Sequence, residues 1–104
     1  MNQIDTFIKL LEKGQDNALL RYSLGNEYIK VKEFMDAITH LEKAIEFNPT
    51  YSAAWKLYAK ALTESEQIEA AMDAYQKGIV VAEENGDKQA AKEMQVFLKR
   101  LQKS

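Results

Sequence analysis

The spacing of small residues constrains the fold of this chain more than any other feature. In the segment DAITHLEKAIEFNPTY (36–51), Ala37 and Ala44 lie seven residues apart with Leu41 between them, so all three share one face of a helix. A face that mixes the smallest side chains with a large apolar one is typical of two helices that approach closely. The segment therefore predicts a helix packed tightly against a second helix.

The same pattern returns 34 residues later in the chain. This offset pairs Ala37 with Ala71 and Ala44 with Gly78, so small residues recur at the same places. The other positions that keep their size are Leu24 with Tyr58, Gly25 with Ala59, Tyr28 with Leu62, Phe34 with Ile68, and Leu41 with Tyr75. A fixed period of this length predicts stacked pairs of antiparallel helices.

These residues resemble the consensus of the tetratricopeptide repeat (TPR) family. Residues 18–51 carry Leu24, Gly25, Tyr28, Ala37, Leu41, Ala44 and Pro49, and residues 52–85 carry Trp55, Tyr58, Ala59, Leu62, Ala71, Tyr75 and Gly78. Two positions depart from it, since Arg21 stands where the family favours Trp and Glu83 where Pro is usual. The resemblance implies an all-α fold of antiparallel helix-turn-helix repeats, a TPR-like α-solenoid of about six helices.

We expect one domain with an N-terminal half-repeat helix (1–17), repeat 1 (18–51), repeat 2 (52–85) and a C-terminal capping helix (86–104). The expected helices are about 3–13, 17–31, 34–47, 51–65, 67–84 and 87–103. A strict period would place Lys92 and Glu93 where the family packs its core, so we infer an insertion of about two residues near the turn before the last helix. Asp16 or Asn17 is expected to cap the second helix.

The composition gives no signal for catalysis. The chain has no Cys, its four Gly are scattered, and His40 is the only histidine, expected on the solvent-facing side of its helix. We therefore predict no enzymatic activity, no cofactor and no metal site. The N-terminal stretch contains charged residues and reads as neither a signal peptide nor a membrane span, so we expect a cytoplasmic protein.

Charge is unevenly distributed. The net charge is −2, but residues 86–104 hold five basic and two acidic residues, which leaves the preceding part at −5. This asymmetry is too small to indicate nucleic acid as a partner, and the basic residues lack interleaved aromatic residues.

In the resembling family, the first helix of each repeat lines a concave surface that holds a peptide or a partner's helix. Carried over by register, that surface comprises Leu19, Tyr22, Asn26, Ile29, Lys30, Ala53, Lys56, Lys60, Thr63, Glu64, Gln89, Lys92, Val96, Lys99 and Arg100. Six of these fifteen are basic and one is acidic, which favours an acidic peptide or a terminal carboxylate as partner. The expected binding residues are Tyr22, Asn26, Lys30, Lys56, Lys60, Lys92, Lys99 and Arg100.

Some co-chaperones of this family grip a carboxylate through a fixed set of Lys, Asn and Arg residues. This chain supplies Asn26 and, with the inferred shift, Lys92, but has Tyr22, Leu57 and Val96 at the other positions, so that clamp is not expected.

Two functional hypotheses remain open. The first is a non-catalytic adaptor, although the same lysines are also explained as residues that only solvate a helical face. The second is a homo-oligomeric assembly subunit that pairs through its last helix, where Val96 lies away from the apolar stripe of Met94 and Leu98. The expected state is a monomer or a weak homodimer.

Overall fold

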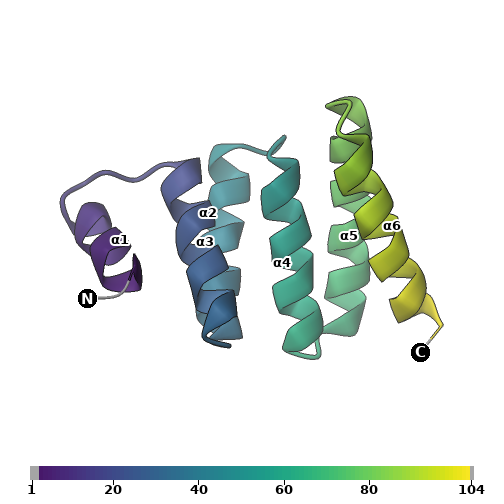
Figure 1. The fold of residues 1–104 in the computed structure, drawn as a ribbon, viewed down its shortest axis with the longest axis horizontal. Helices are drawn as coiled ribbons and strands as arrows, with labels where there is room; N and C mark the ends of the chain where they lie inside the picture. Colours follow the sequence, from purple (N-terminus) through teal and green to yellow (C-terminus); the bar gives the residue numbers. More distant parts are fainter. Residues whose placement is uncertain (1–2, 104) are drawn as a thin grey trace.

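The computed structural model describes residues 3–103, and these form six helices (Figure 1). Their bounds are α1 Gln3–Glu12, α2 Ala18–Lys30, α3 Phe34–Phe47, α4 Ser52–Glu64, α5 Ile68–Glu84 and α6 Lys88–Gln102. Every boundary lies within one residue of the range predicted from the sequence. The predicted all-α repeat fold is therefore confirmed.

The helices form two layers. Helices α2, α4 and α6 lie nearer the viewer in Figure 1, with α3 and α5 behind them. Each helix packs on the next one in the chain, and α2 also contacts α4, as α4 contacts α6. The result is an elongated body of 42 × 28 × 18 Å whose front layer consists of alternate helices.

Close contact between the paired helices rests on the small residues that define the repeat. Ala37, Leu41 and Ala44 on α3 are fully buried, as predicted. Gly25 on α2 faces them, and a Cβ at this position would overlap the buried side chain of Leu41. A larger residue at either side would push the two helices apart.

The second pair meets in the same way. A Cβ at Gly78 on α5 would lie 2.7 Å from Sδ of Met94 and 2.9 Å from Cβ of Trp55. Met94, part of the apolar stripe of the last helix, is fully buried. Gly78 therefore lets both α4 and α6 approach α5.

The two-residue shift of α6 has a structural cause. Helix α4 begins 34 residues after α2, but α6 begins 36 residues after α4. Helix α5 has 17 residues against 14 in α3, and the turn that follows it is one residue shorter. The extra length thus lies in the last turn of α5, and Gly86, with φ +76°, closes the connection to α6.

Side chains secure the starts of two helices. The Asn17 side chain accepts a hydrogen bond from the Leu20 amide at 2.8 Å, so Asn17 is the cap of α2. Asp87 accepts from the Ala90 amide at 3.2 Å and also from the hydroxyl of buried Ser52 at 3.1 Å. Asp87 therefore caps α6 and ties it to the start of α4.

The expectation for His40 is wrong, because this side chain is partly buried between α2 and α3. Its ring stacks on Tyr28 with centroids 5.5 Å apart, and its Nδ1 accepts a hydrogen bond from Arg21 at 3.0 Å. Arg21 also donates to both carboxylate oxygens of Asp16, at 2.7 and 2.8 Å. Arg21, which departs from the family consensus, therefore forms side-chain hydrogen bonds with both His40 and Asp16.

Candidate functional site

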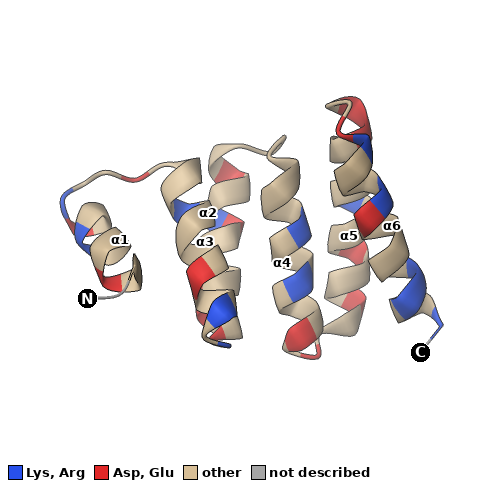
Figure 2. Cartoon of the chain, in the orientation of Figure 1, with Lys and Arg blue, Asp and Glu red and all other residues tan. Residues whose placement is uncertain are grey.

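The candidate binding surface is the face formed by α2, α4 and α6. On α4, Lys56 and Lys60 are one helical turn apart and share a side of the helix. Figure 2 shows basic segments of α4 on the side toward the viewer, with an acidic segment at the lower end of this helix. Lys60 is exposed, and among the described residues it forms no ion pair.

Lys56 does not present a free charge. Its Nζ donates to Oε1 of Glu93 on α6 at 2.8 Å, with both side chains partly exposed. The hydrogen bond and the positive charge of Lys56 hold the pKa of Glu93 below its usual range. Glu93 was absent from the predicted surface, so the surface carries less positive charge than the sequence indicated. Its place opposite Lys56 follows from contact between α4 and α6, which the repeat period does not reveal.

The basic residues of α6 are divided between two surfaces. Arg100 lines a hollow with Thr63 and Glu64 of α4, and therefore belongs to the candidate surface. Lys92 instead lines a hollow with Glu83 and Lys88 at the α5–α6 edge. Lys99 lies two turns after Lys92 on the same side of α6. The structure thus places Arg100 with the α4 residues, and Lys92 and Lys99 nearer the outer edge.

Helix α2 contributes a less basic part of the surface. Tyr22 is partly buried and packs on Tyr51 with ring centroids 4.9 Å apart. Lys30 pairs with Glu27 at 3.0 Å, one turn earlier on the same helix. Asn26 is partly buried between these two positions. This end of the surface therefore offers an aromatic ring and an amide more than it offers net charge.

Two aromatic residues outside the predicted set, Tyr75 of α5 and Phe97 of α6, lie where α5 and α6 meet α4. Phe97 stacks on Tyr75 with centroids 5.9 Å apart, and the Arg100 guanidinium lies 5.5 Å from the centre of the Phe97 ring. Together with Thr63, Glu64 and Leu101 they line a hollow of about 240 Å³. The hollow combines an apolar floor with one cation and one carboxylate at its rim. The sequence signal for it is helical spacing, because Phe97 precedes Arg100 by three residues and so lies on the same side of α6.

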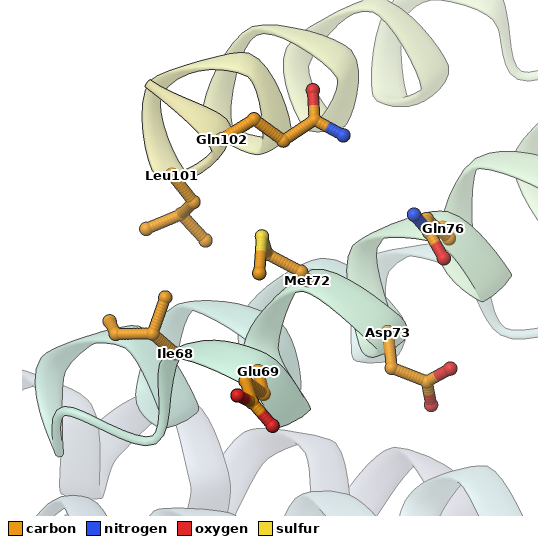
Figure 3. A pocket seen from close by; sticks show the side chains of 7 residues that line it. All are labelled: Ile68, Glu69, Met72, Asp73, Gln76, Leu101 and Gln102. Atoms are coloured by element: carbon orange, nitrogen blue, oxygen red, sulfur yellow. The ribbon is translucent and has the colours of Figure 1, made fainter. Parts of the chain in front are cut away.

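A second surface lies at the C-terminal edge, between α5 and α6. Figure 3 shows Leu101 of α6 facing Ile68 and Met72 of α5 across a hollow of about 780 Å³. Glu69 and Asp73 lie on the same side of α5. Ile38 occupies the position of Met72 one repeat earlier and is only 7% exposed. The C-terminal edge therefore exposes apolar surface that is covered between neighbouring repeats.

Residues 3–103 contain no group of three or more acidic residues or histidines arranged to hold a metal ion. Over the same residues, no helix combines the length and the apolar character needed to cross a bilayer.

Comparison with known proteins identifies the family. Models of the tetratricopeptide repeat match residues 18–51 and residues 40–73. The TPR repeat-containing protein PA0015 of Pseudomonas aeruginosa is 43% identical over 101 residues, covering 97% of this chain and 96% of that protein. The chain therefore belongs to the tetratricopeptide repeat family.

Two solved structures place the fold within the same family. The solution structure of BPP2914 from Bordetella parapertussis is 39% identical and has a TM-score of 0.88, covering 99% of this chain and 90% of that one. The TPR2B domain of yeast Sti1, solved in a complex with pHsp70, also has a TM-score of 0.88 at 17% identity, covering 96% of this chain and 80% of that one.

Proposed function

We propose that this protein is a non-catalytic protein-interaction module that binds an acidic peptide segment along the face of α2, α4 and α6. The observation that carries the proposal is the exposed, unpaired Lys60 at the centre of this face, with Arg100 on one side and Asn26 on the other. A cation presented by a concave helical surface steers an anionic partner and strengthens its binding.

Two relatives of known fold support a peptide as the partner. The yeast Sti1 domain was solved with pHsp70, and the second TPR domain of human RPAP3 with the HSP70 peptide SGPTIEEVD. That peptide carries three acidic residues and no basic one. We infer the same class of ligand for this chain, held by a different set of side chains, with an affinity on the order of micromolar because the surface spans only two repeats.

The ion pairs on this face decide which lysine should be substituted in the test. Reversing Lys56 would place two carboxylates opposite each other at Glu93, whereas Lys60→Glu leaves every described ion pair intact. Lys88→Glu, at the outer edge of α6, changes the net charge equally and serves as the control.

The test is affinity capture from a lysate with wild type, Lys60→Glu and Lys88→Glu, read by mass spectrometry. We expect acidic ligands to be retained by wild type and Lys88→Glu and lost from Lys60→Glu. Equal retention by all three proteins would contradict the proposal.

The C-terminal edge favours a second candidate function, homodimerisation. Its apolar centre of Ile68, Met72 and Leu101 is flanked by Glu69 and Asp73, while the last turn of α6 carries Lys99 and Arg100, and Lys103 follows the helix. A two-fold pairing of this edge would bring acidic α5 near basic α6 of a second copy.

Light scattering across a range of concentrations tests this homodimerisation. The hypothesis expects a molar mass that rises with concentration in wild type but not in Met72→Glu, and a constant monomer mass would refute it.

A further inference from the structure

Another hollow, separate from the proposed peptide surface, lies between α3 and α4. It measures about 310 Å³ and is lined by Glu42, Ile45, Glu46, Trp55 and Tyr58. On α4, residues 55 and 58 point to the side of the helix opposite residues 56 and 60, because successive positions rotate by about 100°. The hollow therefore opens away from the lysines of the proposed peptide surface.

Two aromatic rings form one wall of the hollow. Trp55 and Tyr58 meet edge to face with centroids 6.2 Å apart, and Nε1 of Trp55 donates to the carbonyl oxygen of Pro49 at 2.9 Å. These contacts hold both rings in place before any ligand arrives. A pre-positioned ring binds a cation at less entropic cost than a mobile one.

Two carboxylates form the opposite wall. Glu42 and Glu46 lie one turn apart on α3, so both reach the same hollow. Burial, and then the charge of Glu42, raise the pKa of Tyr58, in keeping with a carboxylate close to this ring. Lys43 pairs with Glu46 at 3.9 Å and does not line the hollow. Among the described residues Glu42 forms no ion pair, so the wall keeps a net negative charge.

The repeat itself shows that the fold does not require this combination. At the next junction, between α5 and α6, the equivalent positions hold Gln76, Ile79, Val80, Ala91 and Met94. That set contains no carboxylate and no aromatic ring, yet the helices pack equally well there, with Ala91 and Met94 buried. The acidic and aromatic lining is thus particular to the α3–α4 junction.

We propose that this hollow binds the guanidinium group of an arginine side chain presented by a partner protein. A guanidinium is planar, so it stacks on a Trp or Tyr ring while its N–H groups donate to carboxylates, and it loses little hydration on entering. The compact ammonium of lysine satisfies the carboxylates but not the stacking. The volume suits a single side chain more than a whole small-molecule ligand.

The chain carries its own reporter for the test, because Trp55 is its only tryptophan. Trp55 fluorescence is followed at constant ionic strength while Nα-acetyl-arginine amide is added, with the citrulline and lysine counterparts as neutral and ammonium controls. We expect a saturable change with the arginine compound in the millimolar range, a weaker one with lysine and none with citrulline. A glycine peptide with one central arginine should bind at least as well as the free amide.

The double variant Glu42→Gln, Glu46→Gln should weaken arginine binding at least about fivefold, because stacking alone remains. Glu83→Gln with Glu84→Gln removes the same charge at the end of α5 and should bind as wild type, and circular dichroism checks that both variants fold. Equal responses to arginine and citrulline, equal binding by the two double variants, the absence of a saturable change, or binding of the free amide but not the peptide would each overturn the proposal.

Discussion

The two repeats place different kinds of residue at the same junction between their first and second helices. In repeat 2, Trp55 of α4 lies beside Gly78 of α5, and position 74 holds the small, buried residue Ala74. In repeat 1 the same places hold Arg21 and His40, joined by a hydrogen bond, and Arg21 is paired in turn with Asp16. A partly exposed junction between helices can therefore be closed by a polar chain as well as by an aromatic ring.

The small residues vary in a related way. Repeat 1 has Gly25 on its first helix and Ala44 on its second, whereas repeat 2 has Ala59 on the first and Gly78 on the second. Each pair contains one glycine and one alanine, all four buried. Small residues at these positions thus allow close approach of the helices in both repeats, while the neighbouring polar or aromatic contact differs.

The largest expected effect is overpacking of this shared contact. Ala44 is fully buried, so Ala44→Leu should lower the free energy of unfolding by about 1–3 kcal/mol. Ala70→Leu, on the exposed side of α5, is the matched control and should change stability by less than about 0.5 kcal/mol. Chemical denaturation measures both, and an unaffected Ala44→Leu protein would show that the helix pair is not closely packed.

A smaller effect is expected from the polar chain of repeat 1. Arg21→Ala removes the hydrogen bond to His40 and the pair with Asp16, and should lower the free energy of unfolding by about 1 kcal/mol.

Adding His40→Ala to Arg21→Trp recreates the combination of Trp55 and Ala74 found in repeat 2. The double variant should be more stable than the sum of the two single changes predicts, since each single change leaves an unmatched neighbour. Strict additivity in a double-mutant cycle would mean that the two positions are not coupled.

The smallest effect is a pH dependence confined to repeat 1. Burial first, and then the Arg21 guanidinium, lower the pKa of His40 from its usual 6.5, against the opposing influence of Asp36 and Asp16. The unfolded chain then takes up a proton at higher pH than the folded one, so the free energy of unfolding falls as the pH drops below about 6.5. His40→Gln should remove this loss between neutral and mildly acidic pH, as read from thermal unfolding.

A second loss is expected at lower pH. The hydrogen bond from Arg21 lowers the pKa of Asp16 below 3.8, so its contribution is present above that pH and is lost as the carboxyl becomes protonated. This loss should persist in His40→Gln and become smaller in Asp16→Asn, where the contribution of Glu93 remains. An identical pH profile for all three proteins would show that these residues do not make the repeat sensitive to acid.

The repeat period made most of the fold predictable. Small and large residues recur at a fixed distance only when the same helix contact is built twice, so the helices, their order and the shift of α6 were accessible from residues such as Ala37, Ala71 and Gly78. Contacts between unlike residues from different helices could not be predicted from this period. The Arg21–His40 bond and the Lys56–Glu93 pair involve positions that do not repeat, so no spacing indicates them.

The candidate site was predictable only in outline. The residues predicted for it lie on α2, α4 and α6. Lys92 and Arg100 fell into one predicted group because eight positions turn a helix by only about 80°, although they line different hollows. The negative charge of Glu93 within the surface depends on α4–α6 packing, which single-helix patterns do not report.

Binding of an acidic peptide to this face is measured by titrating fluorescently labelled SGPTIEEVD into wild type, Lys60→Glu and Lys88→Glu and following the anisotropy. A matched peptide in which the three acidic residues are replaced by their amides serves as the second control. We expect saturable binding by wild type and Lys88→Glu that weakens with added salt, at least about fivefold weaker binding by Lys60→Glu, and little binding of the neutral peptide. Equal binding by the two variants, or equal binding of the two peptides, would contradict this expectation.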